Sequence, residues 1–130
     1  MSISDLPILS MLRTRMQWHQ ARQGVLAENV ANADTPRFRP HDLVPPDMSA
    51  KEGVGRPLAL AGTSPAHLQA TGGSAFASRS ENAYQVRPSG NAVSLEEEMI
   101  KVAANQMDYQ AAAALYSRSL ALIKTALGKR

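Results

Sequence analysis

Residues 94–128, SLEEEMIKVAANQMDYQAAAALYSRSLALIKTALG, decide the fold of this chain of 130 residues. Apolar side chains recur in this stretch at alternating steps of three and four residues, which is the spacing of one face of an α-helix. We therefore predict one helix of about 33 residues, roughly 50 Å long at 1.5 Å per residue. The repeating positions are Leu95, Met99, Val102, Gln106, Tyr109, Ala113, Tyr116, Leu120, Ile123 and Leu127.

The two ends of this stretch carry residues that begin and end helices. Ser94 stands at the N-cap position with Glu97 three residues later, which predicts a capping box. The acidic run at residues 96–98 also suits the positive end of the helix dipole. Gly128 suits the C-terminal cap, where basic residues surround it.

A second apolar face lies beside the first on the same helix. A helix that is apolar on more than one side is buried on more than one side. We therefore predict that it packs both within the chain and against copies of the chain or related chains. The second face consists of Ile100, Ala103, Met107, Ala111, Ala114 and Ala121.

The first 33 residues predict another long helix, of about 28 residues and roughly 42 Å. Asp5 is suited to its N-cap and Pro7 to its first turn. The same alternating spacing gives a helix face that is polar at two positions. This face consists of Leu9, Leu12, Met16, His19, Gln23, Leu26, Val30 and Ala33.

The middle of the chain, residues 34–92, is rich in proline and glycine. Residues 57–62 and 83–88 alternate well enough for weak strands, with Leu58 beside Leu60 and Tyr84 beside Val86. Residues 45–57 and 71–80 are typical of loop or disorder. The predicted fold is therefore mainly α: long N- and C-terminal helices form a coiled-coil-like pair, with a middle that is loop or short β-hairpin. Segments 1–33, 34–92 and 93–130 together make one assembly domain.

The composition predicts a small core. Hydrophobic residues make up 44% of the chain, but many are alanine, and aromatic residues make up 5%. A buried leucine-sized side chain contributes about 1.5–3 kcal/mol, whereas ordering each residue costs roughly 1–2 kcal/mol. An ordinary helical hairpin explains the periodicity equally well, but such a pair would be marginally stable alone.

No catalytic or metal-binding pattern is found in the sequence. There is no cysteine, and His19, His41 and His67 share no metal-ligand spacing with acidic residues. Serine occurs without a G-x-S-x-G motif, and the acidic run at 96–98 is explained by its position at a helix start. We therefore expect no enzyme and no cofactor.

The net charge of +3 is spread along the chain without a basic block, which disfavours nucleic-acid binding. The N-terminal residues lack the basic region of a cleavable signal peptide, and no apolar run approaches a membrane span. We therefore expect a chain that stays in the cytosol or leaves it by a route without such a signal.

Residues 27–40, AENVANADTPRFRP, end the first helix in an unusual way. The prolines and the Asn and Asp residues explain a helix stop and a turn. Asn29 and Asn32 lie one turn apart and could hydrogen-bond to a neighbour, and Phe38 could enter an apolar groove. We therefore interpret the segment as a junction leading into a strand-like arm that reaches another subunit.

Residues 26–40 resemble the signature of flagellar axial proteins, an Ala/Asn-rich helix end followed by Thr-Pro. Asn29, Ala31, Asn32, Thr35 and Pro36 match it, whereas Arg37 replaces the commoner glycine and Phe38 the commoner tyrosine. Within the family, residues 90–129 and the short middle are similar to the proximal rod proteins, as is GTSPAHL at 62–68. The acidic C-terminal motif of other rod and hook proteins is missing.

This resemblance implies a structural subunit of the bacterial flagellar basal-body rod, a helical tube that connects the membrane ring to the distal rod. It implies a periplasmic location and type III export without a cleaved signal. The implied partners are copies of the chain, FlgC-like rod proteins, the FliE adaptor and the membrane-ring protein, with no nucleic acid and no membrane span.

Two other classes remain open, a helical adaptor or regulator of a soluble partner and a basic nucleic-acid binder. Neither needs the Asn-rich junction. The rod interpretation predicts a subunit interface consisting of Leu9, Leu12, Met16, Leu26, Asn29, Val30, Asn32, Pro36, Phe38, Met99, Val102, Tyr109, Tyr116, Leu120, Ile123 and Leu127.

Overall fold

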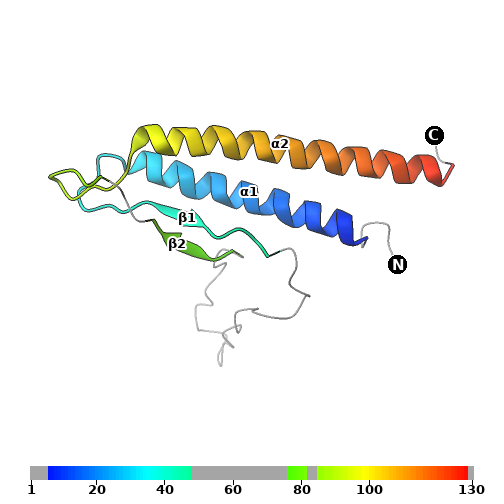
Figure 1. The fold of residues 1–130 in the computed structure, drawn as a ribbon, viewed down its shortest axis with the longest axis horizontal. Helices are drawn as coiled ribbons and strands as arrows, with labels where there is room; N and C mark the ends of the chain where they lie inside the picture. The colour runs from blue at the N-terminus through cyan, green and yellow to red at the C-terminus, as the bar shows by residue number, and fades with distance from the viewer. Residues whose placement is uncertain (1–5, 48–75, 82–84, 129–130) are drawn as a thin grey trace, which may run out of the picture.

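The computed structural model describes residues 6–47, 76–81 and 85–128. Two long helices, α1 (Pro7–Ala31) and α2 (Leu95–Ala126), pack side by side. The start of α1 lies beside the end of α2, so the pair is antiparallel (Figure 1). The strands β1 (His41–Leu43) and β2 (Ser78–Ser80) form a small sheet against α1. The mainly α prediction is therefore confirmed.

The helix ends agree only partly with the sequence prediction. Pro7 stands in the first turn of α1, while Asp5 lies outside the described residues. Ser94 is the N-cap residue of α2, but its side chain makes no capping hydrogen bond. The predicted capping box is therefore wrong. The Glu97 carboxylate lies 3.6 Å from the Lys101 ammonium group instead. Gly128 follows the C-cap with a φ of 69°, the left-handed conformation expected of it.

The strands lie elsewhere than predicted. β1 and β2 pair antiparallel, with Asp42 opposite Arg79. The stretch at 71–80, predicted as loop, contains β2, whereas Val86 lies outside any strand and is 62% exposed. Some of the predicted features lie outside the described residues: the alternating stretch 57–62, the segment 62–68 with His67, and Tyr84.

The face of α1 predicted from its periodicity turns toward α2. Leu9 and Leu26 on this face are fully buried. On α2 the buried residues are Glu98, Asn105 and Ala112, one position before Met99, Gln106 and Ala113. The face of α2 that meets α1 is thus polar in its first half, because the apolar repeat there is rotated away from α1.

Candidate subunit-contact site

The outer face of α2 carries large apolar side chains that nothing in the described chain covers. Ile100 is 70% exposed, Met107 66%, Leu115 53% and Leu122 67%. At 3.6 residues per turn these four positions lie within about 80° of one another, and the centre of the set lies about 120° around the helix from Glu98, Asn105 and Ala112. We call Ile100, Met107, Leu115 and Leu122 the outer apolar stripe.

Small residues flank the outer apolar stripe and leave room for a helix to approach. Ala103, Ala111, Ala114 and Ala121, which belong to the predicted second apolar face, are all exposed. Met107 and Ile100 belong to both sets. The exposure of these residues agrees with the prediction of a second apolar face on α2. The described chain leaves this face uncovered, whereas α1 covers the other side of α2.

The predicted interface residues fall into two groups. Most of those on the helices are buried or half-buried within the chain: Leu9 and Leu26 are buried, and the half-buried ones are Leu12, Met16, Val30, Val102, Tyr109, Tyr116, Leu120 and Ile123. Met99 (54% exposed) and Leu127 (59% exposed) remain accessible, as does Pro36. The role of all of these residues between subunits stays a prediction.

Asn29 joins three elements inside the chain. Its Nδ2 donates to the His41 carbonyl and to Glu98 Oε2, both at 2.8 Å, and its Oδ1 accepts from the His41 N–H at 3.0 Å. The side chain is 1% exposed. Asn29 therefore fixes β1 and the first turn of α2 to the end of α1, and its amide has no free donor left for a neighbour.

Asn32 shapes the turn after α1. Its Nδ2 donates to the Glu28 carbonyl at 2.9 Å, and its Oδ1 accepts from the Thr35 hydroxyl at 3.0 Å. The ring of half-buried Phe38 meets the His41 ring edge-on, with 6.4 Å between centroids. The segment predicted to reach another subunit thus also has partners within the chain.

Arg37 has a left-handed backbone with a φ of 62°. Its N–H donates to the Ser89 carbonyl at 3.2 Å, and a side chain added at Gly90 would lie 3.2 Å from its Cγ. Two loop segments therefore cross closely at this point. Glycine adopts such a left-handed φ without the strain that a side chain brings.

Sequence reasoning missed Asn91, which is 1% exposed. Its Nδ2 donates to the carbonyls of Asn32 (2.9 Å) and Thr35 (2.6 Å), and its Oδ1 accepts from the Val93 N–H (2.9 Å). It ties the turn after α1 to the segment that leads into α2. A Gly-Asn pair just before a helix was the available signal, because Asn commonly bonds to nearby backbone in turns.

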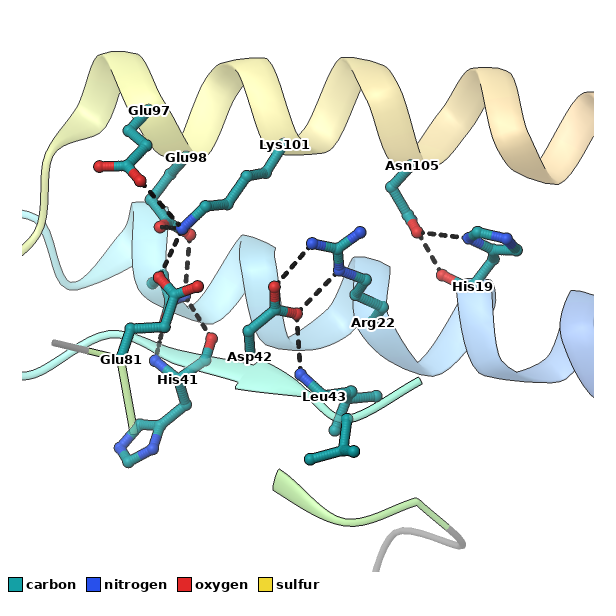
Figure 2. A network of polar contacts seen from close by, with 12 residues as sticks. His19, Arg22, His41, Asp42, Leu43, Glu81, Glu97, Glu98, Lys101 and Asn105 are labelled. Carbon is teal, nitrogen blue, oxygen red and sulfur yellow. Dashed lines mark hydrogen bonds and ion pairs between the residues drawn. The ribbon is translucent and has the colours of Figure 1, made fainter. Parts of the chain in front are cut away.

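Asp42 and Lys101 anchor charged contacts between the sheet and the helices (Figure 2). Arg22 donates to both carboxylate oxygens of Asp42, at 2.8 and 2.6 Å. Burial raises the pKa of Asp42, but the hydrogen bonds from Arg22 and the Leu43 N–H and the charge of Arg22 outweigh it, so the pKa lies below its ordinary 3.8. The Arg22 pKa is raised by the same hydrogen bond.

Lys101 is held by three carboxylates. It donates to Glu81, lies 3.0 Å from Glu98 Oε1 and lies 3.6 Å from Glu97 Oε1. Burial lowers the Lys101 pKa, but the hydrogen bonds to Glu81 and Glu98 more than compensate, and the pKa is raised. Glu98 is 2% exposed. Its carboxylate pairs with the Lys101 ammonium group and accepts a hydrogen bond from the Asn29 side chain.

His19 belongs to the interface between the helices. Its Nδ1 lies 2.7 Å from Asn105 Oδ1, and Asn105 Nδ2 donates to the His19 carbonyl and to Gln23. His19 and Gln23, the two polar positions of the α1 repeat, therefore meet the polar half of α2. His19 is a buried structural residue rather than part of an acid–base pair.

The described residues contain no group of three or more His, Cys, Asp or Glu side chains arranged to hold a metal ion. Within the same parts of the chain, neither helix combines the length and hydropathy that crossing a membrane requires. What the described residues do offer is an exposed apolar helix face beside a junction fixed by asparagine side chains.

Comparison with known proteins identifies the family of this chain. The family model "Flagella basal body rod protein" matches residues 9–39, which include most of α1 and the asparagine junction. The flagellar basal body rod protein FlgB of Agrobacterium fabrum (strain C58 / ATCC 33970) is 32% identical over 118 residues, 88% of this chain and 87% of that protein. The chain therefore belongs to the flagellar basal-body rod protein family.

Proposed function

We propose that this structural subunit of the flagellar basal-body rod is built into the rod through the outer apolar stripe of α2, which packs against helices of neighbouring rod subunits. The exposure of Ile100, Met107, Leu115 and Leu122 carries the proposal. Four large apolar side chains along one helix face form a continuous apolar surface, which typically marks an interaction site.

The chemistry of α2 favours a helix as the partner. Between Lys101 and Arg118 the helix has one charged residue, Asp108, so the contact could be dry over several turns. The exposed alanines allow a second backbone to come close, as small residues do in tight helix packing. The outer apolar stripe lies about 120° around the helix from the side that meets α1, so α2 can pack on α1 and on a neighbouring subunit at the same time.

A contact of this kind is heterologous, because the surface on one subunit meets a different surface on the next. Heterologous contacts that do not close into a ring generate open helical assemblies. We propose that the helix pair forms part of the wall of such a tube between the membrane ring and the distal rod. The residues predicted at the interface that are accessible here, Met99, Leu127 and Pro36, would lie at its margins.

The partners we propose are copies of the chain, FlgC-like rod proteins, the FliE adaptor and the membrane-ring protein, in the periplasm. Type III export without a cleaved signal is part of the same proposal. We propose no catalytic activity, since the buried and part-buried charged groups of Arg22, Asp42, Glu98 and Lys101 are engaged in ion pairs that hold the fold. The similarity to rod proteins supports each of these points.

Met107→Asp tests the assembly surface. An aspartate in a dry helix contact would lose water without gaining a partner, so rod assembly and swimming should be lost while the purified chain keeps its helical circular dichroism. The matched control is Gln110→Asp, which places the same side chain on an exposed position of α2 beside the stripe. It should retain basal bodies and motility.

Normal swimming and normal rod incorporation of Met107→Asp would refute the proposed surface. The adaptor interpretation would be favoured instead if the wild-type chain bound a soluble regulator and basal bodies remained normal after deletion of the gene for this chain. Both measurements require only electron microscopy of basal bodies and a motility assay in a strain lacking the native copy.

A further inference from the structure

The small sheet contributes little apolar surface to the contact with the helices. All three residues of β2 are exposed, and Leu43 is the one buried residue of β1. Several further attachments of the described strands and of the residues beside them are polar. They include the bonds of Arg22 to Asp42, of Lys101 to Glu81, of Asn29 to His41 and of the Trp18 indole N–H to the Val44 carbonyl.

Two of these attachments are ion pairs that come from different helices. Arg22 projects from α1 to Asp42 in β1, and Lys101 projects from α2 to Glu81, which directly follows β2 (Figure 2). Their side chains are 18–28% exposed, so water and salt reach both pairs. We call Arg22–Asp42 and Lys101–Glu81 the ionic latch.

The helix pair has attachments of its own that do not involve the sheet. Leu9, Leu26 and Ala112 are buried between or beside the helices, and Asn105 bonds to both His19 and Gln23 across the pair. Opening the ionic latch would therefore leave these contacts in place. Local openings of this kind occur where few apolar contacts hold an element.

We propose that Lys101 is a positioning residue that, with Arg22, sets the direction of the two-stranded sheet relative to the helix pair, and that opening of the ionic latch lets the sheet turn about its remaining attachments at Asn29 and Trp18. A subunit with such a latch can present its sheet at different angles while its helices keep the same packing. This is a property of the single chain, so it is independent of the assembly surface proposed above.

A distance measurement between two spin labels tests the proposal on the full chain. The sequence has no cysteine, so Ser80→Cys on β2 and Ala104→Cys on α2, both at exposed positions, provide unique attachment sites. Pulsed electron paramagnetic resonance should give a single narrow distance distribution with Lys101 present. Lys101→Met should broaden it toward longer distances, and Lys101→Arg should restore the narrow distribution because arginine also bonds carboxylates.

Two controls separate positioning from general stability. A label pair at Ala27→Cys and Ala104→Cys reports the helices alone and should not change in Glu81→Gln, which leaves the ion pair between Lys101 and Glu98 in place. Lys124→Met removes another lysine of α2, which is exposed and has no ion-pair partner among the described residues, and should change neither distribution. Unchanged sheet distances in Lys101→Met, or broadening of both label pairs in Glu81→Gln, would overturn the proposal.

Glu81→Gln gives a second test with a smaller perturbation. It removes the negative charge on the sheet side of the latch but keeps a side chain of the same size. Amide hydrogen exchange of residues 41–44 and 78–81 should accelerate about tenfold or more, as expected for loss of a hydrogen bond to a charged group. Exchange in the middle of α1 and α2 should stay unchanged, and equal acceleration in sheet and helices would contradict independent movement of the sheet.

Discussion

At the scale of single residues, Arg37 is the position where the local conformation and the side chain disagree. A left-handed φ costs a non-glycine residue roughly 1–2 kcal/mol, and Arg37 has a φ of 62°. The hydrogen bond from the Arg37 N–H to the Ser89 carbonyl holds it there.

Arg37→Gly should therefore stabilise the chain by about 0.5–1 kcal/mol, because the relief of backbone strain in the folded state outweighs the added conformational entropy of the unfolded state. Chemical denaturation of the purified protein measures this change. Gly90→Ala, at a φ of 81° and against Arg37, should destabilise it. A destabilising Arg37→Gly would mean that the arginine side chain makes contacts that outweigh its backbone strain.

Asp42 gives the chain a defined response to acid. Its pKa is lower in the folded than in the unfolded chain, so its stabilising contribution is complete above its ordinary pKa of 3.8 and is lost as the pH falls through the folded value. The free energy of unfolding of the wild-type chain should exceed that of Asp42→Asn at pH 7, and the difference should shrink toward pH 3. A constant difference over this range would show that the charge of Asp42 does not contribute.

At the scale of elements, periodicity predicted both helices but not which side of α2 faces α1. The repeat that includes Met99 is apolar, yet Glu98 and Asn105 occupy the buried positions. Their burial depends on Lys101, Asn29 and His19, which come from other turns and from the other helix. A sequence repeat ranks residues by hydropathy and therefore misses polar residues that are satisfied by distant partners.

A short β-hairpin was predicted for the middle of the chain, but the positions of its strands escaped prediction for a related reason. β2 has the sequence Ser-Arg-Ser, without the alternation that indicates a strand, and it is fixed by pairing with β1 and by Glu81. Asn29 was identified as important from its spacing, but its partners, His41 and Glu98, could be found only in the folded chain. Single-residue signals survive in a sequence, whereas their long-range partners do not.

The start of α2 provides a test at this scale. A working N-cap serine contributes about 1 kcal/mol, but the Ser94 side chain makes no capping bond. Ser94→Ala should therefore change the free energy of unfolding by less than about 0.5 kcal/mol. If denaturation showed that Ser94→Ala lowers the free energy of unfolding by about 1 kcal/mol or more, the capping box would be shown to form in solution.

At the scale of the whole molecule, the helix pair is long and its core is thin. The buried apolar residues among those described are Leu9, Trp18, Leu26, Ala33, Leu43, Ala92, Val93 and Ala112, three of which are alanine. Glu98, Asn29, Asn91 and Asn105 fill much of the remaining interior. Such a core favours a specific arrangement of elements over high stability, and this is consistent with a subunit whose folding is completed by its neighbours.

The thermal unfolding of the isolated chain should show this dependence on neighbours. At low micromolar concentration we expect a broad transition, since few large apolar groups unfold together. At higher concentration the midpoint should rise, because association of folded chains through the outer apolar stripe stabilises them by mass action. Circular dichroism at several concentrations, with sedimentation velocity on the same samples, measures both effects.

Met107→Asp should abolish the concentration dependence of the unfolding midpoint, and Gln110→Asp should preserve it. A sharp transition in a strictly monomeric wild-type chain would mean that the thin core is sufficient by itself, and would remove the energetic reason for folding on assembly.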